Sequence, residues 1–132
     1  MKLEQSTLMD AGLLWIRVLT GCGMAYHGYG KIFLKGLDGF TQGVAAMGFP
    51  FPAFFAWGAA LSEFLGGICL ALGFFPNIAA FFIFSTMTVA AFVAHASDPF
   101  KAKELALAYW AVSGMLILTG GGRFSLSNLF RK

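Results

Sequence analysis

The sequence predicts an all-α integral membrane protein, folded as one four-helix bundle over residues 1–132 with a short interfacial helix in its first loop. Two observations predict this class. The chain is 58% hydrophobic and only 11% of its residues are charged, whereas a soluble domain carries about 25% charged residues. The stretch 64–97 contains no charged residue and is longer than the roughly 20 residues that one membrane crossing needs.

The first predicted span covers about residues 10–30, and the segment after it is too broken to cross a membrane. Residues 31–51 contain Gly36, Gly48 and Pro50 among other helix-breaking residues. We expect this segment to form a loop that carries a short interfacial helix between residues 38 and 47.

The uncharged stretch is divided at Gly73 and Pro76. Proline cannot continue the helix before it, but it fits the first turn of the helix after it. The break therefore predicts two helices joined by a very short hairpin. The second and third predicted spans cover about residues 52–75 and 76–95.

The fourth predicted span covers about residues 104–120 and ends at Gly120, a residue typical of helix C-termini. With four spans, both termini and the hairpin lie on one side of the membrane, named side A here, and the two longer loops lie on side B. Lysine and arginine are divided evenly between the sides. The clustered Arg131 and Lys132 favour termini in the cytoplasm.

Composition also restricts the partners. The formal net charge is +3, but the basic residues are scattered, so we expect the lipid bilayer rather than nucleic acid as a partner. Cys22 and Cys69 are expected at different depths, as free thiols. The chain has no Glu-x-x-His or His-x-x-x-His spacing, so we expect no metal site, and no flavin or haem site is expected either.

Two charged residues fall near the middle of predicted spans. An ionised side chain at that depth costs about 2.5 to 3.5 kcal/mol on insertion scales, so it needs a partner or a function. Counted from side B, Arg17 and Glu63 both lie about 15 Å deep. We therefore expect an ion pair between Arg17 and Glu63, which is either a structural clamp or part of a polar site.

Helical spacing predicts a polar funnel that opens at side B. Arg17, His27 and Lys31 share one face of the first span, and the third span ends where the fourth begins. The residues expected to line the funnel are Arg17, His27, Lys31, Glu63, His95, Glu104 and Tyr109. Taken singly, the histidines are also consistent with interfacial residues, and Lys31 and Glu104 with ordinary helix-end charges.

The pattern resembles the DoxX family of small bacterial four-helix membrane proteins. The resemblance runs from about Leu14 to Leu129 and rests on the order and spacing of several motifs. These motifs include Arg17, His27-Gly28-Tyr29-Gly30-Lys31, Gly48-Phe49-Pro50, Glu63-Phe64-Leu65-Gly66-Gly67, Leu72-Gly73-Phe74-Phe75, His95, Glu104-Leu105-Ala106-Leu107 and the segment from Gly120 to Leu126.

The resemblance implies a bacterial inner-membrane protein that serves as a subunit or accessory of a redox system. A related branch of the family is similar to the small subunit of thiosulfate:quinone oxidoreductase. The polar positions shared with the family are Arg17, His27, Lys31, Glu63, His95 and Glu104. We expect no thiosulfate chemistry, because no exposed nucleophile or redox-active thiol pair supports it.

Two functions of different classes remain open. The first is a quinone-interacting subunit, in which His27, His95, Tyr109 or Glu104 meets the quinone ring while Glu63 and Arg17 tune their protons. The second is a scaffold without chemistry, whose loop 31–51 holds a soluble or membrane redox protein. A second copy of the chain is a further candidate partner, and a small carrier or proton path ranks last.

Overall fold

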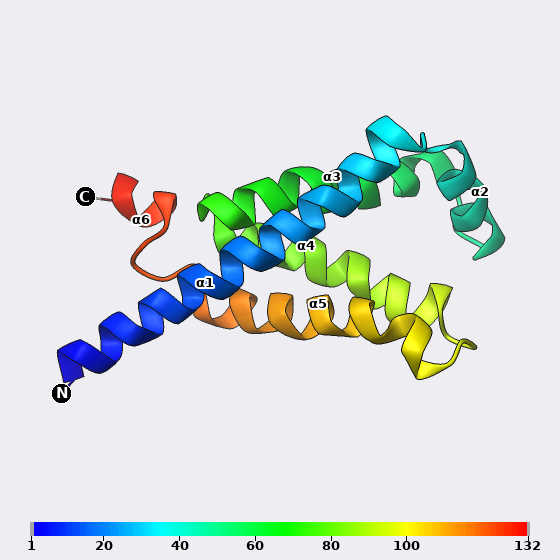
Figure 1. Ribbon diagram of the computed structural model, residues 1–132. Helices are drawn as coiled ribbons and strands as arrows, with labels where there is room; N and C mark the ends of the chain where they lie inside the picture. Colours follow the sequence, from blue (N-terminus) through cyan, green and yellow to red (C-terminus); the bar gives the residue numbers. More distant parts are fainter. Residues whose placement is uncertain (1, 132) are drawn as a thin grey trace.

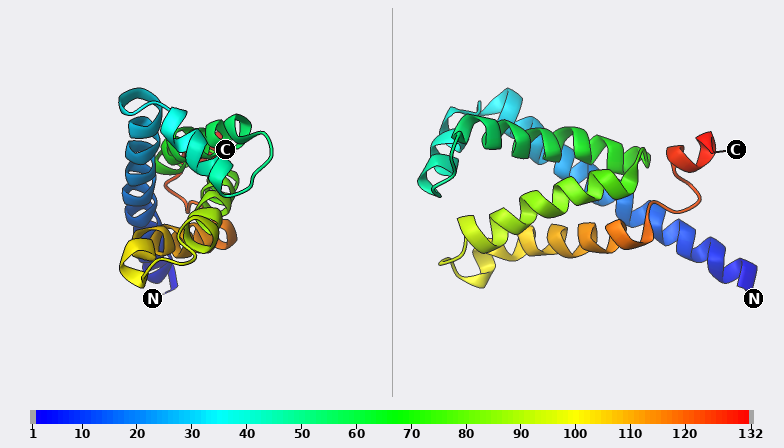
Figure 2. Two further views of the ribbon diagram at one scale, coloured as in Figure 1. Left: turned by 90° about the vertical axis from the view of Figure 1, so that its right-hand side faces the viewer. Right: turned by 180° about the vertical axis from the view of Figure 1, so that it is seen from behind.

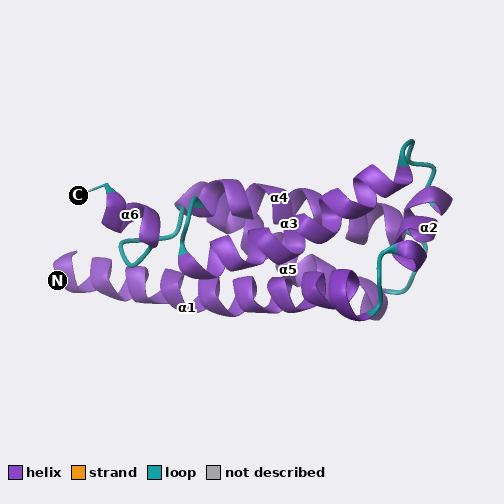
Figure 3. Ribbon diagram, turned by 90° about the horizontal axis from the view of Figure 1, so that it is seen from above, coloured by secondary structure: helices purple, strands orange, loops and turns teal. Residues whose placement is uncertain are grey.

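The computed structural model describes residues 2–131, and this part of the chain is all-helical without a strand. Helices account for most of it, joined by short loops (Figure 3). The elements are α1 (Lys2–Tyr29), the π-helical turn η1 (Gly30–Leu34), α2 (Asp38–Ala46), α3 (Pro52–Leu72), α4 (Pro76–Val89), the π-helical turn η2 (Ala90–Ala94), α5 (Phe100–Thr119) and α6 (Leu126–Phe130).

Three continuous helical segments are long and apolar enough to cross a membrane. They are Glu4–Leu34, Pro52–Leu72 and Pro76–Ala94. The predicted class, an all-α membrane protein, is confirmed. Helix α5 has 20 residues and packs along α4, but Lys101, Lys103 and Glu104 occupy its first turns. Its role as a fourth crossing stays a prediction.

The four long helices α1, α3, α4 and α5 form the bundle (Figure 1). Helix α1 packs against α3, α3 against α4, and α4 against α5. The buried cluster at the centre contains Met24, Leu70, Ile83, Met87 and Leu116. Toward the end that carries α2, the α1–α3 pair and the α4–α5 pair diverge (Figure 2).

Small residues allow α1 and α3 to approach closely. A Cβ atom added to Gly21 would lie 2.5 Å from the backbone nitrogen of Ala71, and one added to Gly67 would lie 2.5 Å from that of Ala25. Glycine at such crossings lets helix backbones touch in a membrane. Seven residues further along α1, Gly28 meets the backbone of Phe64 in the same way, which fixes an antiparallel register.

The break predicted between the second and third spans is confirmed. Helix α3 ends at Leu72, Gly73 has a φ of +75°, and Phe75 has a φ of +45°. Pro76 occupies the first turn of α4, where its fixed φ suits a helix start. The hairpin is bound to the end of α5, because the side-chain amide of Asn77 donates a hydrogen bond to the Ile117 carbonyl oxygen at 2.8 Å.

Two boundaries differ from those expected. Helix α1 begins by Lys2 and its helical path continues through η1 to Leu34, whereas the sequence predicted a span over about 10–30. Its first turns extend beyond the rest of the bundle (Figure 1). Helix α5 starts at Phe100 rather than near residue 104. The short helix expected in the first loop is confirmed as α2, over Asp38–Ala46.

Candidate functional site

The buried carboxylate of Glu63 forms an ion pair with Lys31. The Lys31 Nζ atom lies 2.6 Å from Oε1 and 2.8 Å from Oε2 of Glu63. The Glu63 side chain is only 2% exposed, and that of Lys31 is 30% exposed. Glu63 lies about halfway along the 21 residues of α3, so the pair combines a deeply buried acid with a base that reaches the molecular surface.

The π-helical turn η1 carries Lys31. In this turn the backbone N–H of Lys35 donates to the Gly30 carbonyl oxygen at 2.9 Å, five residues earlier. Gly28, two residues before the turn, allows α1 to pack closely against α3 at Phe64. These two features place Lys31 beside Glu63.

Helix α2 covers the same pair through Phe40. The Lys31 Nζ atom lies 4.5 Å from the centre of the Phe40 ring, a geometry that attracts a cation to the face of an aromatic ring. Sequence reasoning missed Phe40 as a site residue. The sequence signal for Phe40 is weak, because the chain has 16 phenylalanines and nothing in the sequence indicates that this one contacts a lysine nine positions earlier.

The predicted ion pair between Arg17 and Glu63 is wrong. Gly21 lies opposite Ala71 and Gly28 opposite Phe64, so this register puts Arg17 at the α3–α4 hairpin on side A. Glu63 lies about 12 residues away along the same register, about 18 Å at the rise of an α-helix. The depth estimate failed because the helical path of α1 does not end near His27 but continues through Leu34.

Arg17 instead caps the C-terminus of α3. Its Nη1 atom donates to the carbonyl oxygens of Leu70 at 3.3 Å and Ala71 at 3.1 Å, and its Nη2 atom donates to that of Phe124 at 2.9 Å. The last carbonyl groups of a helix have no partner within it, and the negative end of the helix dipole favours a cation there. Arg17 is fully buried and therefore acts as a structural clamp on carbonyl groups.

His27 and Tyr109 meet between α1 and α5. Their rings are 6.0 Å apart between centres and nearly perpendicular, at 82°. The Tyr109 hydroxyl packs against Gly23, where a Cβ atom would collide with it. Gly28, the residue after His27, packs against the backbone of Phe64, the residue after Glu63. Four of the seven expected funnel residues, His27, Lys31, Glu63 and Tyr109, thus occupy one region of the structure.

The other two expected residues of side B are placed differently. The His95 Nδ1 atom lies 2.7 Å from Asp98 Oδ2, and both side chains are exposed, by 42% and 48%. Glu104 is exposed near the start of α5, and it forms no salt bridge with any residue in the described range 2–131. The structure therefore does not bring His95 and Glu104 to Glu63.

No group of three or more His, Cys, Asp or Glu residues with metal-binding geometry occurs among the described residues. Cys22 and Cys69 are free thiols.

Comparison with known proteins decides the family. The family model described as DoxX matches residues 12–96. The chain belongs to the DoxX family. A DoxX-like relative, inner membrane protein YqjF of Escherichia coli strain K12, is 31% identical over 129 residues, which are 95% of this chain and 96% of the relative. No solved structure matches the chain.

The part of this DoxX-family protein that matches the family model begins within α1, at residue 12, and includes α2, α3 and α4. Lys31 and Glu63 therefore both lie within the matched region, and so does Arg17. Tyr109 and the carbonyl group of Phe124 that receives Arg17 lie outside it.

Proposed function

We propose that this DoxX-family membrane protein is a subunit of a redox system and binds a quinone or quinol headgroup at the Lys31–Glu63 pair. The observation that carries the proposal is the buried Glu63 carboxylate, held at 2.6 Å by a lysine that is 30% exposed. Charged groups inside a membrane protein are costly and mark functional sites. The partly exposed ammonium group can donate a hydrogen bond to a ligand, while the buried acid holds it in position.

The chemistry of the donor set fits a quinone. The Lys31 ammonium group is a hydrogen-bond donor for a ring carbonyl oxygen, and the Tyr109 hydroxyl and His27 ring lie in the same region. Reduction of a quinone to a quinol consumes two electrons and two protons. The residues named here handle protons only, so the electrons must come from a partner redox protein, either soluble or in the membrane.

The proposed location is taken from the name of the relative. YqjF is named as an inner membrane protein, and we propose the same membrane here, with the termini in the cytoplasm. The clustered basic residues Arg131 and Lys132 favour this orientation.

Binding of a short-chain quinone analogue to the purified protein in lipid nanodiscs tests the proposal. Glu63→Gln keeps the volume of the side chain but removes its charge, and Lys31→Met keeps the length of the stem. We expect each substitution to weaken binding about tenfold. Lys31→Met removes the charged donor of a hydrogen bond to the ligand, and Glu63→Gln removes the charge that holds this donor in place. Glu104→Gln, an exposed acid away from the pair, is the matched control and should bind as the parent protein does.

Circular dichroism and size-exclusion chromatography show which variants remain folded. Unchanged affinity in folded Glu63→Gln and Lys31→Met proteins would contradict quinone binding at this pair.

A scaffold without chemistry is the second candidate function, and one observation favours it. Both deeply buried charges have structural partners: Arg17 binds carbonyl groups and Glu63 binds Lys31. A scaffold would keep the activity of its complex in Glu63→Gln and lose it when the exposed residues of segment 35–51 are scrambled. A quinone-binding subunit would instead lose the activity of its complex in Glu63→Gln.

A further inference from the structure

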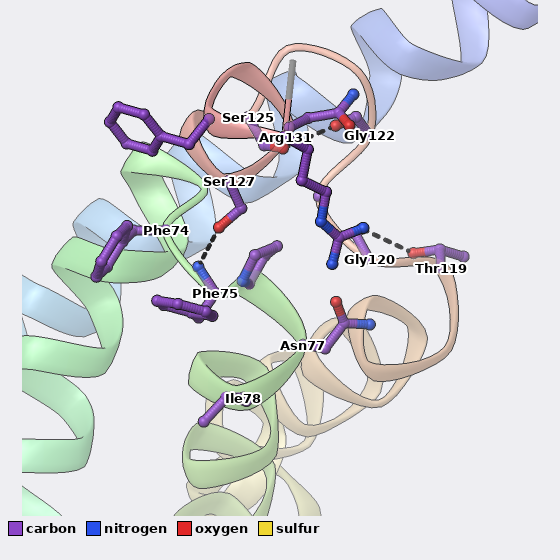
Figure 4. A pocket seen from close by; sticks show the side chains of 14 residues that line it. Phe74, Phe75, Asn77, Ile78, Thr119, Gly120, Gly122, Ser125, Ser127 and Arg131 are labelled. Carbon is purple, nitrogen blue, oxygen red and sulfur yellow. Dashed lines mark hydrogen bonds between the residues drawn. The ribbon is translucent and has the colours of Figure 1, made fainter.

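A cavity lies on side A, at the opposite end of the molecule from the Lys31–Glu63 pair. It has a volume of about 640 Å³ and is enclosed by the α3–α4 hairpin, the end of α5 and the C-terminal segment (Figure 4). We name it the interfacial pocket. Its polar side chains are Asn77, Thr119, Ser125, Ser127, Asn128 and Arg131, and none of its lining residues is acidic.

Of the residues that the structure describes, Arg131 is the one charged residue that lines the interfacial pocket. The Arg131 guanidinium group points into it toward Asn77 (Figure 4). Helix α4 begins on the pocket wall at Pro76, which has no N–H. The N–H of the preceding Phe75 donates to the Ser127 hydroxyl oxygen at 2.7 Å. Asn77 and Ile78 therefore supply the N–H groups of the first turn. The free N–H groups of a first helical turn and the positive end of the helix dipole both attract anions. The arginine and the helix terminus thus favour the same kind of ligand.

An apolar groove adjoins this pocket. It has a volume of about 440 Å³, runs between α3 and α4 from Gly58 past Cys69, and shares Phe74, Phe75 and Ile78 with the interfacial pocket. From Gly58 to the end of α3 at Leu72, beside the pocket, the groove extends about 21 Å along the helix at 1.5 Å per residue. That length is more than half of the roughly 30 Å hydrocarbon thickness, so the groove is deep enough for an acyl chain of one leaflet.

We propose that the interfacial pocket and the apolar groove together bind one anionic phospholipid. Its phosphate group occupies the pocket between Arg131 and the N-terminus of α4, and one acyl chain lies in the groove. A free phosphate ion would not use the groove, and a transmembrane helix docked in the groove would leave the cationic pocket unexplained. A phospholipid is the ligand with an anionic end and an apolar chain joined at the membrane surface.

The groove can be filled without disturbing the fold. A Cβ atom added to Gly58 would meet no other atom within 4 Å, so the substitution Gly58→Leu places a side chain in the open groove. Gly12 in α1 also has nothing within 4 Å of an added Cβ and lies outside the groove, so Gly12→Leu is its matched control. For the pocket, Arg131→Gln removes the cation, and exposed Lys35→Gln on side B is its control.

Native mass spectrometry of the full-length protein in mild detergent tests the proposal. The protein is titrated with phosphatidylglycerol, with phosphatidylcholine carrying the same acyl chains, and with glycerol 3-phosphate. We expect one phosphatidylglycerol molecule per chain to be retained in preference to phosphatidylcholine. Arg131→Gln should lower its affinity about fivefold, the contribution of one basic group at an anionic lipid surface, and Gly58→Leu should lower the affinity for both lipids. The two control variants should bind as the parent does.

Several results would overturn this assignment. Equal retention of the two lipids would remove the role of the phosphate charge. Equal losses in Arg131→Gln and Lys35→Gln would indicate diffuse surface attraction, and binding of glycerol 3-phosphate as tight as that of the lipid would indicate a small-anion site. A protein dimer that Gly58→Leu disrupts, without a change in lipid retention, would assign the groove to a second copy of the chain. None of these outcomes bears on quinone binding at Glu63.

Discussion

At the scale of single residues, the two mid-span charges have separate roles. Arg17 is a cap for α3, and Glu63 is the acid of a polar site. The sequence identified both residues, because an ionisable group in an apolar helix is conspicuous. It could not identify their partners, since the N–H groups of a guanidinium donate to backbone carbonyl oxygens as well as to carboxylates. Every residue carries a backbone carbonyl group, so no residue type in the sequence indicates that kind of partner.

Arg17→Met tests the structural role of Arg17. The substitution removes three hydrogen bonds to carbonyl oxygens while it keeps an apolar stem of similar length. We expect the free energy of unfolding, measured by denaturant titration in micelles, to fall by about 3 kcal/mol, with little effect on quinone affinity. Arg123→Met is the control, because the exposed Arg123 pairs with Asp10 at 3.7 Å and such pairs contribute less than about 1 kcal/mol. Equal losses in both variants would refute the cap.

At the scale of elements, the register in which α1 crosses α3 determines the depth at which the polar residues of these two helices lie in the bundle. The buried face of α3 comprises Ala56, Ala60, Glu63, Gly67 and Leu70. The register of that face against α1, which the sequence predicted from equal depths of Arg17 and Glu63, was wrong. Register depends on where each helix leaves the membrane, and η1 extends α1 by a turn whose five-residue hydrogen bond has no recognisable sequence signal.

Gly67→Ala tests the close approach of these helices. The added methyl group would collide with backbone atoms of Ala25 and Gly21, at 2.5 and 2.6 Å, and backbone cannot move aside cheaply. We expect a loss of about 2 kcal/mol in the free energy of unfolding, typical of overpacking. Gly58→Ala, on the same helix but with open space around it, should be neutral or slightly stabilising. The opposite order of stabilities would contradict the register.

At the scale of the whole molecule, the sequence predicted the class, the helix order and the hairpin correctly. These features follow from strong local signals. The uncharged stretch is longer than one membrane crossing needs, and a proline marks the point where it divides into two helices. The predicted funnel depended on how the helices are arranged in space. His95 follows η2 in the loop between α4 and α5, and Glu104 lies near the start of α5. The α4–α5 pair diverges from α1 and α3 toward the end that carries α2 (Figure 2), so the structure brings only some of the expected residues together.

The central claim is that quinone binds beside Lys31 and Glu63 rather than elsewhere in the bundle. Photo-crosslinking with an azidoquinone, followed by peptide mapping, tests it most directly. We expect labelled peptides from residues 27–40 and around Tyr109, with labelling suppressed by excess unlabelled quinone and reduced in Glu63→Gln. Competable labelling confined to His95 and Glu104, or to the groove between α3 and α4, would contradict the account.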